Sequence, residues 1–337
     1  MKKFPILSAF LCVLVTLTLS CKKEESPVIY SGFSQGTTFN ILFFYKGDTA
    51  LIISEIDSVL KLMDSTASLW DSSSIISKIN KNEPVEITAL FRRLFERSME
   101  ISNESGGAFD CTVGPLVRAW GFYRKQGSEP PASTVDSLRT LIGYSKIRLE
   151  GDYIVKNAPG IQIDFNAIAQ GMTVDMIAEL FHQEKISNYL IELGGEVRTS
   201  GFRKEQEPWK IGIEKPSAND SSAQEVGFTV ALSNKSISTS GNYRKYFIRD
   251  GRKFSHTIDP FTGFPVSHSL LSVSVIAPDC ATADAYATVC MVLGLEKGEK
   301  FLESRKDVEG LFIFTDEKGA FQVRYTSGFG NYLQNKQ

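Results

Sequence analysis

The sequence predicts an α+β fold in which antiparallel sheets are flanked by helices. Several segments place an apolar residue roughly every three to four positions, as amphipathic helices do. Runs rich in β-branched and aromatic residues alternate with these segments, and short turns join many of those runs as hairpins. The 337 residues are 42% hydrophobic and 23% charged, which is typical of a globular protein. A formal net charge of −2 provides no basic field that would favour binding to nucleic acid.

The helices are predicted from their apolar stripes and from the residues that stop them. Residues 49–63 carry isoleucine, valine, leucine and methionine on one side of a 3.6-residue period. Residues 88–105 repeat this pattern, and Gly106 and Gly107 end it. Ser133 and Asp136 have the spacing of a capping box for a short helix that runs to about residue 142. Further helices are expected at residues 166–184, 281–293 and 296–303.

The strands are predicted from β-branched and aromatic runs bounded by turn residues. They are expected at residues 37–45, 161–165, 188–193, 209–214, 226–232, 243–249, 253–257, 270–277, 310–315 and 321–325. Asp250 and Gly251 form a hairpin signal between two of these runs, and residues 316–319 join the last two in the same way.

The first residues predict export. Lys2 and Lys3 precede an almost continuously apolar run over residues 4–19, which is shorter than the roughly 20 residues of a membrane-spanning helix. A positive start with a short apolar core is typical of a secretory signal. Ser20 and Cys21 then resemble the end of a bacterial lipoprotein signal, with Cys21 as the lipidated residue. Simple secretion with cleavage nearby is the alternative.

The chain is therefore expected to contain a signal peptide at residues 1–20, a polar tether at 21–31 and one folded domain at 32–330. The mature protein is expected in the cell envelope, lipid-anchored to a bacterial membrane and facing the periplasm. Cys111, Cys280 and Cys290 then remain in the folded domain. Their odd number argues against complete pairing, so they are expected to be buried small hydrophobic residues.

Glycine-rich polar loops interrupt the core pattern, and such loops are where sites are usually built. They cover residues 35–38, 105–110, 112–115, 164–171, 194–196, 239–242 and 255–263. Main-chain N–H groups in these loops and at helix N-termini can hold phosphate oxygens. The sequence has neither a GxGxxG nor a P-loop fingerprint in the context that nucleotide binding requires.

Two groups of side chains suit chemistry. Asp284 and Thr288 lie four apart on a predicted helix, so both oxygens face one side and suit Mg²⁺. Spacing alone favours the structural interpretation, in which the helix dipole stabilises an aspartate in the first turn and the threonine bonds back to a carbonyl. His256 begins a turn rich in specified residues, among them Asp259 and Pro260, which could hold it for acid–base work or ligand contact. A structural histidine is the alternative.

Taken together, these segments resemble the ApbE family, the FAD:protein FMN transferases. The resemblance runs from about Gly32 to Phe329, and six motifs occur in the family's order. They are GAFDCTVGP (107–115), DFNAIAQG (164–171), LGGE (193–196), STSGN (238–242), HTIDPFTG (256–263) and ADAYAT (283–288). The resemblance implies an ApbE-like, T-fold-type mixed α/β domain. It also agrees with export, because members are typically lipoproteins.

The resemblance further implies a Mg²⁺-dependent activity on FAD. Such enzymes cleave the FAD pyrophosphate, transfer FMN to a threonine or serine hydroxyl of an acceptor protein and release AMP. Typical acceptors are flavin-carrying subunits of membrane redox pumps. The reaction is a phosphoryl transfer, in which the enzyme must neutralise the diphosphate and align the hydroxyl.

The resemblance assigns roles to particular residues. Asp284, Thr288 and the main-chain carbonyl of Ala167 match the family's Mg²⁺ ligands. Trp70 occupies the place where an aromatic ring stacks on the flavin, and His256 matches the family's site histidine, which would contact the diphosphate or take a proton from the acceptor. Gln35 and Gln170 stand where other members often carry methionine and lysine. The positions expected to hold FAD are Gln35, Trp70, Ala108, Phe109, Asp110, Asp164, Gln170, His256 and Ile258.

Two other functions remain open from the sequence. The same pocket and metal would serve a lipoprotein that stores FAD or hydrolyses it to FMN and AMP, with water in place of the acceptor hydroxyl. The non-enzymatic hypothesis is a structural lipoprotein of the cell envelope, in which the glycine loops serve only as turns. His256, Asp284 and Thr288 favour an enzyme with His256 and Asp284 as its catalytic residues.

Overall fold

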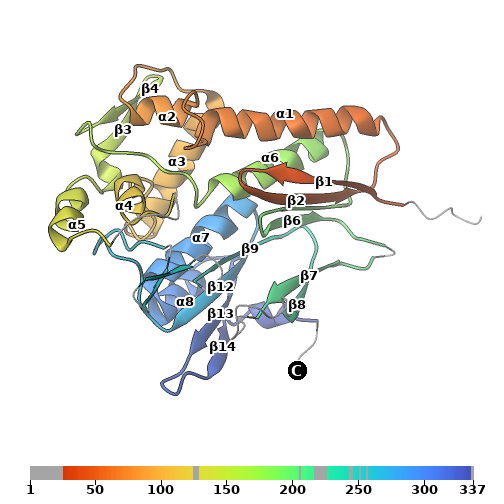
Figure 1. Ribbon diagram of the computed structural model, residues 1–337. Coiled ribbons are helices and arrows are strands. Elements are labelled where there is room, and N and C mark those ends of the chain that lie inside the picture. Colours follow the sequence, from red (N-terminus) through yellow and green to blue (C-terminus); the bar gives the residue numbers. More distant parts are fainter. Residues whose placement is uncertain are drawn as a thin grey trace, which may run out of the picture.

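An eight-stranded antiparallel sheet is the frame of the molecule (Figure 1). The computed structural model describes residues 26–123, 129–204, 206–215, 226–242, 246–249, 252–255 and 257–334. Each strand of the sheet pairs with its neighbours in antiparallel orientation. In spatial order the strands are β1 (Val28–Ser34), β2 (Thr37–Phe43), β5 (Tyr189–Leu193), β6 (Glu196–Ser200), β9 (Ser236–Gly241), β12 (Leu270–Ala277), β13 (Glu309–Thr315) and β14 (Phe321–Tyr325).

Two-stranded hairpins extend this frame. They are β3 (Ile147–Glu150) with β4 (Tyr153–Lys156), β7 (Trp209–Glu214) with β8 (Val226–Leu232), and β10 (Tyr246–Arg249) with β11 (Arg252–Ser255). In the last of these Arg249 pairs with Arg252, so the hairpin predicted around residues 250 and 251 is confirmed.

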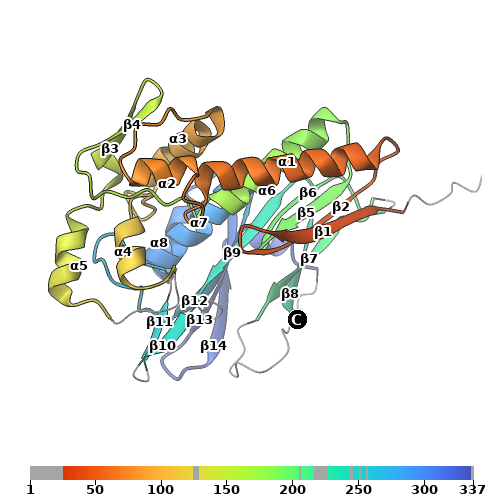
Figure 2. The same cartoon turned by 45° about the horizontal axis from the view of Figure 1, so that its top comes forward.

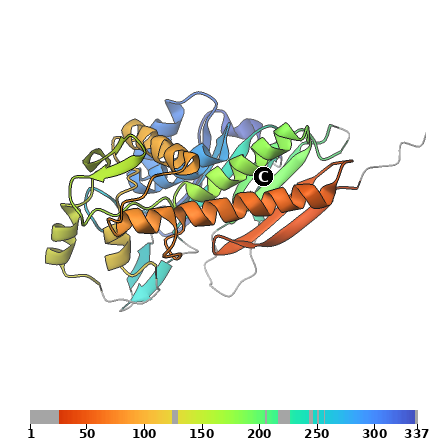
Figure 3. The same cartoon turned by 90° about the horizontal axis from the view of Figure 1, so that it is seen from above.

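Helices flank the sheet, as predicted. Those described are α1 (Thr49–Ala67), α2 (Ile75–Asn80), α3 (Ala89–Glu104), α4 (Gly114–Ala119), α5 (Ala132–Arg139), α6 (Ala169–Gln183), α7 (Cys280–Leu293) and α8 (Leu295–Glu303). Short 3₁₀ turns are η1 (Tyr144–Lys146) and η2 (Phe329–Asn331). Figure 2 shows α1, α6 and α7 lying across one face of the sheet, and Figure 3 shows α1 running along this layer beside β1 and β2. The predicted α+β class with antiparallel sheets is confirmed.

Both faces of the sheet are covered by apolar side chains. On the helical face Ile52 and Ile56 of α1 pack with Phe181 of α6 over Ile41 and Ile191 of the sheet. Spacings of four residues place Ile52, Ile56 and Leu60 on one side of α1, which is the stripe predicted from the sequence. The opposite face is covered by β7, β8 and η2, whose buried members include Val230, Leu232 and Phe329.

The strand predicted at residues 161–165 is wrong. Only Gln162 of this segment forms a bridge, in parallel with Val113. The main chain is instead satisfied by a side chain, because Asn80 Oδ1 accepts from Ile163 N at 2.7 Å and Asn80 Nδ2 donates to the Ile163 carbonyl at 2.8 Å. The apolar residues Ile161, Ile163 and Phe165 are buried, although this segment belongs to none of the sheets.

Several helix boundaries differ from the prediction, since α1 continues to Ala67 and α5 ends at Arg139 rather than near residue 142. The helix expected from residue 166 begins at Ala169, because residues 166–168 form a turn. The capping box expected at Ser133 is wrong, since the helix begins at Ala132, so that Ser133 lies within its first turn, and its cap, Pro131, makes no side-chain capping bond.

The folded part of the chain begins earlier than expected. Strand β1 starts at Val28, so residues 28–31, predicted as the end of the tether, pair with β2 in the sheet. The predicted signal peptide and Cys21 lie outside the described residues. Within the described ranges, no helix has the length and apolarity needed to cross a bilayer. Cys111, Cys280 and Cys290 are free and buried, as predicted.

Candidate functional site

Helix α7 presents Asp284 and Thr288 toward the start of α6 and toward β9. Asp284 is only 6% exposed, and its Oδ2 accepts from the main-chain N–H of Gly171 at 3.1 Å. Thr288 Oγ1 lies 3.4 Å from Ser240 Oγ on β9. The oxygens of one helical turn therefore lie between the sheet and the first turn of a second helix.

Gly171 permits this arrangement, because α6 and α7 approach closely at that residue. A Cβ at position 171 would lie 2.5 Å from the Cys280 carbonyl oxygen and 2.8 Å from the Ala281 Cα, both of which are backbone atoms. Gly171 lies in the first turn of α6, where main-chain N–H groups have no acceptor within the helix, and its N–H donates to Asp284.

We expect Gly171→Ala to destabilise the protein by about 1–3 kcal/mol, because overpacking against fixed backbone exceeds the roughly 1 kcal/mol that alanine gains in helix propensity. Chemical denaturation of the variant measures this change. Gly298→Ala on α8 is a milder control, because its nearest contact, Cys290 Cα, would lie 3.2 Å from the new Cβ. Stability equal to or above that of the wild type would show that α6 and α7 can separate without cost.

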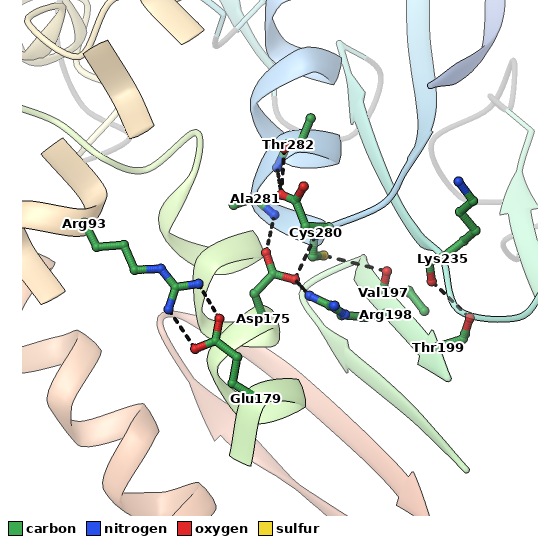
Figure 4. A network of polar contacts seen from close by, with 11 residues as sticks. Arg93, Asp175, Glu179, Val197, Arg198, Thr199, Lys235, Cys280, Ala281 and Thr282 are labelled. Atoms are coloured by element: carbon green, nitrogen blue, oxygen red, sulfur yellow. Dashed lines mark hydrogen bonds and ion pairs between the residues drawn. The ribbon is translucent and has the colours of Figure 1, made fainter. Parts of the chain in front are cut away.

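The start of α7 is fixed by a buried carboxylate of α6 (Figure 4). Asp175 accepts from the main-chain N–H groups of Cys280 and Ala281, each at 2.9 Å, and forms an ion pair with Arg198 of β6. Burial raises the pKa of Asp175, while Arg198 and the two N–H groups oppose that rise. Because α7 is held at its first turn, Asp284 and Thr288 one and two turns later have a defined position.

The β1–β2 turn reaches the same region from the edge of the sheet. Gln35, in the left-handed region at φ 50°, donates from Nε2 to Thr173 Oγ1 of α6 at 2.8 Å. The Thr173 hydroxyl donates in turn to the carbonyl of Ala169 at 2.8 Å. The structure thus brings Gln35 into contact with Thr173, which lies two residues after Gly171 near the start of α6.

A second turn, between β5 and β6, meets the same helix end. Gly194 has φ 69°, and a Cβ there would lie 3.1 Å from Gln170 Nε2 and 2.8 Å from the Thr37 methyl carbon. Glycine is therefore required both by the backbone angle and by the space. The predicted residues Gln35 and Gln170 and the LGGE motif lie around one helix N-terminus.

Asp164, Tyr123 and Trp70 form a cluster of one acidic and two aromatic side chains near the end of α4. Asp164 Oδ2 accepts from the Tyr123 hydroxyl at 2.6 Å, and Asp164 Oδ1 accepts from Asn166 N at 2.7 Å. The Tyr123 ring meets Trp70 edge to face, with ring centroids 6.1 Å apart. Burial raises the pKa of Asp164, and burial together with the Asp164 charge raises the pKa of Tyr123, so the phenol remains a proton donor. Trp70 is 67% exposed, which leaves its ring available to a ligand.

The GAFD segment is an organised loop with buried side chains. Ala108 and Phe109 are 1% and 3% exposed, so a ligand would meet this segment mainly through its main chain. Asp110 accepts from Thr112 N and Oγ1 through Oδ1, and from Tyr144 N at 2.8 Å through Oδ2. Burial raises the pKa of Asp110, and these hydrogen bonds oppose the rise. Both carboxylate oxygens of Asp110 therefore bond to neighbouring residues of the protein, and they hold the shape of this loop.

The turn after β11 docks on the α4–α5 region. Ile258 is buried with Trp120 in a small cluster, and the Trp120 indole N–H donates to the Gly263 carbonyl at 2.9 Å. A Cβ at Gly107 would lie 3.6 Å from the Phe261 ring, so the GAFD loop and this turn are neighbours. His256, predicted as a site residue, lies outside the described residues.

The oxygen donors at α7 fit a magnesium ion better than a transition metal. In the ranges that the structure describes, no group of three or more histidine, cysteine, aspartate or glutamate side chains is arranged to hold a metal. Asp284, Thr288 and the Ala167 carbonyl would offer one carboxylate and two neutral hard oxygens. Mg²⁺ is commonly held by one or two carboxylates with water and substrate phosphates completing its shell.

A cavity of about 720 Å³ lies elsewhere, between α3, α6 and the start of α7, and its lining contains none of the predicted site residues. Its charged groups pair with one another, as in Arg93 with Glu179 and Arg97 with Glu100. Of the predicted residues, Gln35, Gln170 and Asp284 lie instead around the N-terminus of α6. Gly171, Tyr123 and Ser240 were not predicted as site residues, although Gly171 and Ser240 lie inside quoted motifs; Tyr123 carried no signal in the sequence.

The chain is similar in sequence and in structure to known proteins. A sequence model described as "ApbE family" matches residues 35–312. The chain is 33% identical to the FAD:protein FMN transferase of Haemophilus influenzae over 100% of both proteins, and 33% identical to that of Vibrio cholerae over 94% of this chain and 96% of that protein. It superposes on the flavin transferase ApbE of Vibrio cholerae with a TM-score of 0.81 at 32% identity, covering 92% of this chain and 100% of that chain. For the flavinyl transferase ApbE of Pseudomonas stutzeri, in its apo form, the TM-score is 0.82 at 31% identity, with coverage of 93% and 98%.

Proposed function

The chain belongs to the ApbE family of flavin transferases, and from that premise we propose that it transfers FMN from FAD to a threonine or serine hydroxyl of an acceptor protein, with Mg²⁺ and release of AMP. The supporting observation is the buried Asp284 carboxylate beside the first turn of α6, with Thr288 one turn further along α7. A buried carboxylate with neutral hydroxyl and carbonyl oxygens around it suits a divalent cation that is shared with phosphate.

Asp284, Thr288 and the Ala167 carbonyl would hold the magnesium ion. When bound, the ion would neutralise diphosphate charge as the bond to the leaving phosphate breaks. The N-terminus of α6, a helix of 15 residues, would contribute a favourable main-chain dipole near the same phosphates. The chain's own contribution is to align the diphosphate with the acceptor hydroxyl.

The remaining residues would hold the two ends of FAD. Trp70, backed edge to face by Tyr123, offers an exposed ring against which an isoalloxazine can stack. Asp164, Gln35 and Gln170 supply acceptors and donors around the helix end for the polar parts of the dinucleotide. His256 would contact the diphosphate or take the proton of the acceptor hydroxyl.

We expect Tyr123→Phe to weaken FAD binding about tenfold, because it removes a hydrogen bond to a carboxylate, a class of bond worth about 1.5–3 kcal/mol, while keeping the ring. Quenching of flavin fluorescence on titration measures the affinity. Tyr153→Phe is the matched control, since it removes a bond to Glu86 at 2.9 Å on an exposed hairpin. An unchanged affinity for FAD in Tyr123→Phe would show that the hydrogen bond from Tyr123 to Asp164 does not contribute to FAD binding.

One assay tests the function as a whole. The protein is mixed with FAD, Mg²⁺ and the flavin-carrying domain of a redox-pump subunit produced without flavin, and both AMP and the acceptor mass are measured. AMP release that depends on the acceptor, with an FMN-sized mass gain, supports transfer. AMP release without an acceptor would instead identify an FAD pyrophosphatase, and neither product would identify a flavin-binding or structural protein.

The location follows from the same proposal. Acceptors in membrane redox pumps would be reached most directly by an enzyme anchored at the membrane. We place the chain in the cell envelope, exported and lipid-anchored through Cys21, with its folded part facing the periplasm.

A further inference from the structure

The outermost strand of the sheet, β1, carries no charged residue along its seven positions, VIYSGFS. It pairs with β2 at every position, and in the described ranges no strand pairs with its outer side. Natural proteins usually protect an edge strand with charges, proline or a bulge, because exposed N–H and C=O groups attract other strands. An uncharged edge of this length is unusual for a surface that stays bare.

The hairpin register shows which groups point outward. Gln35 and Gly36 form a two-residue turn with φ values of 50° and 76°, a type I′ turn, and Ser34 pairs with Thr37 across it. In such a turn the flanking pair is hydrogen-bonded, and bonded and non-bonded pairs then alternate. Ile29, Ser31 and Phe33 therefore direct their main-chain N–H and C=O groups to the free edge.

The side chains at these outward positions lie on the face of β1 away from α1. Ile29 is 66% exposed and Phe33 is 72% exposed. Tyr30, on the other face, donates to Asp57 of α1 at 2.5 Å, which fixes the orientation of the strand. The free edge thus combines main-chain groups that pair with no other strand in the described ranges with two exposed apolar side chains, Ile29 and Phe33, four residues apart.

The opposite edge of the same sheet differs. Strand β14 carries Arg324, which forms ion pairs with Glu296 at 2.9 Å and Glu299 at 3.1 Å. A charge in mid-strand is one of the usual protections of an edge. The two edge strands of this sheet therefore differ in charge, because β14 carries an arginine and β1 carries no charged residue.

Strand β1 also leads directly into the candidate site. Gln35 follows Ser34 immediately and is bonded to Thr173 on α6, two residues beyond the amide that meets Asp284. A segment lying along β1 would leave its last residue at the turn that contacts α6. Seven residues of strand span about 23 Å, enough to hold a peptide in one register.

We propose that β1 binds an extended segment of the acceptor protein by strand addition, so that the hydroxyl to be modified arrives at the site beside Gln35. The inference rests on the proposed function and adds how the partner is recognised. An acceptor is the one occupant that must reach the site, because its hydroxyl has to meet the diphosphate there. Main-chain pairing supplies affinity that tolerates sequence differences, while Ile29 and Phe33 select apolar residues at alternate positions of the segment.

The test removes one outward N–H without touching the site. Ser31→Pro deletes that donor on an edge strand, where proline is tolerated. Ser31→Ala is its matched control, because both variants lose the bond from Ser31 Oγ to Asn40 Oδ1. With the flavin-carrying domain of a redox-pump subunit as acceptor, we expect Ser31→Pro to raise the KM for acceptor about tenfold, with the affinity for FAD unchanged.

A second pair of variants tests the exposed face. Ile29→Lys/Phe33→Lys should raise the same KM, whereas Phe321→Lys/Val323→Lys on β14, at residues 37% and 40% exposed, should not. Equal KM values in Ser31→Pro, Ser31→Ala and the wild type would overturn the proposal. If the wild type is a dimer that Ser31→Pro dissociates, the occupant of the edge is a second copy of the chain. If the amides of residues 29, 31 and 33 are protected from exchange without acceptor and without a dimer, the occupant is the chain's own residues 1–25.

Hydrogen exchange separates failure of this inference from failure of the proposed function. If the wild type transfers no FMN, the acceptor is added without FAD and the amides of residues 29, 31 and 33 are followed. Their slower exchange in the presence of acceptor would still support strand addition, and unchanged exchange would refute it.

Discussion

Asp284→Asn is expected to lower the rate of FMN transfer by at least about a hundredfold while the protein remains folded. Asparagine has nearly the same volume and keeps an oxygen that can accept from Gly171 N, so the contact between α6 and α7 at 3.1 Å survives. The negative charge that would hold the magnesium ion is lost. Acceptor-dependent AMP release and the mass of the acceptor measure the effect.

A binding measurement removes the ambiguity of an activity loss. With FAD present, Mg²⁺ is expected to raise the melting temperature of the wild type but not that of Asp284→Asn, because binding to the native state adds to stability. Asp136→Asn is the control, since that side chain is 68% exposed on α5. If Asp284→Asn retained both transfer and the Mg²⁺-dependent stabilisation, the metal assignment would be wrong.

Asp284→Ala adds information about the fold. Alanine leaves Gly171 N without the Asp284 oxygen, and an unsatisfied buried donor costs about 1–3 kcal/mol. We therefore expect Asp284→Ala to be less stable than Asp284→Asn, with both inactive. The difference between the two variants isolates what the carboxylate does for the helix crossing from what it does for the reaction.

The helices were predictable because their apolar residues repeat within one segment. Ile52, Ile56 and Leu60 of α1 point to the core at a spacing that is visible in the sequence. Strand β9 was not predictable in this way, because four of its six residues are serine or threonine. Its side chains serve α7 and β12 instead, as in Ser240 with Thr288 and Thr239 with Ser274. Such contacts join residues more than 30 positions apart, which no local pattern records.

The site shows the same division. The motifs around residues 164–171 and 283–288 predicted which segments would form a site, and the structure brings these segments together through Gly171 and Asp284. The contact itself needs the two helices to cross at a glycine, and periodicity does not encode a crossing. Tyr123 could not be found either, because its role depends on Asp164 and Trp70, which approach it from 41 and 53 positions away in the chain.

Asp175→Ala is expected to destabilise the fold by about 3–5 kcal/mol, because breaking a buried ion pair leaves the other charge uncompensated. Asp175 is 3% exposed, and the substitution removes an acceptor from Cys280 N and Ala281 N as well as the partner of Arg198. Thermal unfolding should show a melting temperature lower by about 10 °C. Glu179→Ala, which breaks an exposed pair with Arg93 one turn along the same helix, should change it by less than about 1 kcal/mol.

A double substitution separates the charge from the cap. Arg198→Met with Asp175→Ala removes both members of the ion pair, so we expect it to be more stable than Asp175→Ala alone, as apolar replacement of whole buried pairs often is. The loss that remains measures the two N–H groups at the start of α7. Because that end of α7 positions Asp284, the double variant should recover stability more fully than FMN transfer. Equal recovery of both would mean that the start of α7 does not control the geometry of the site.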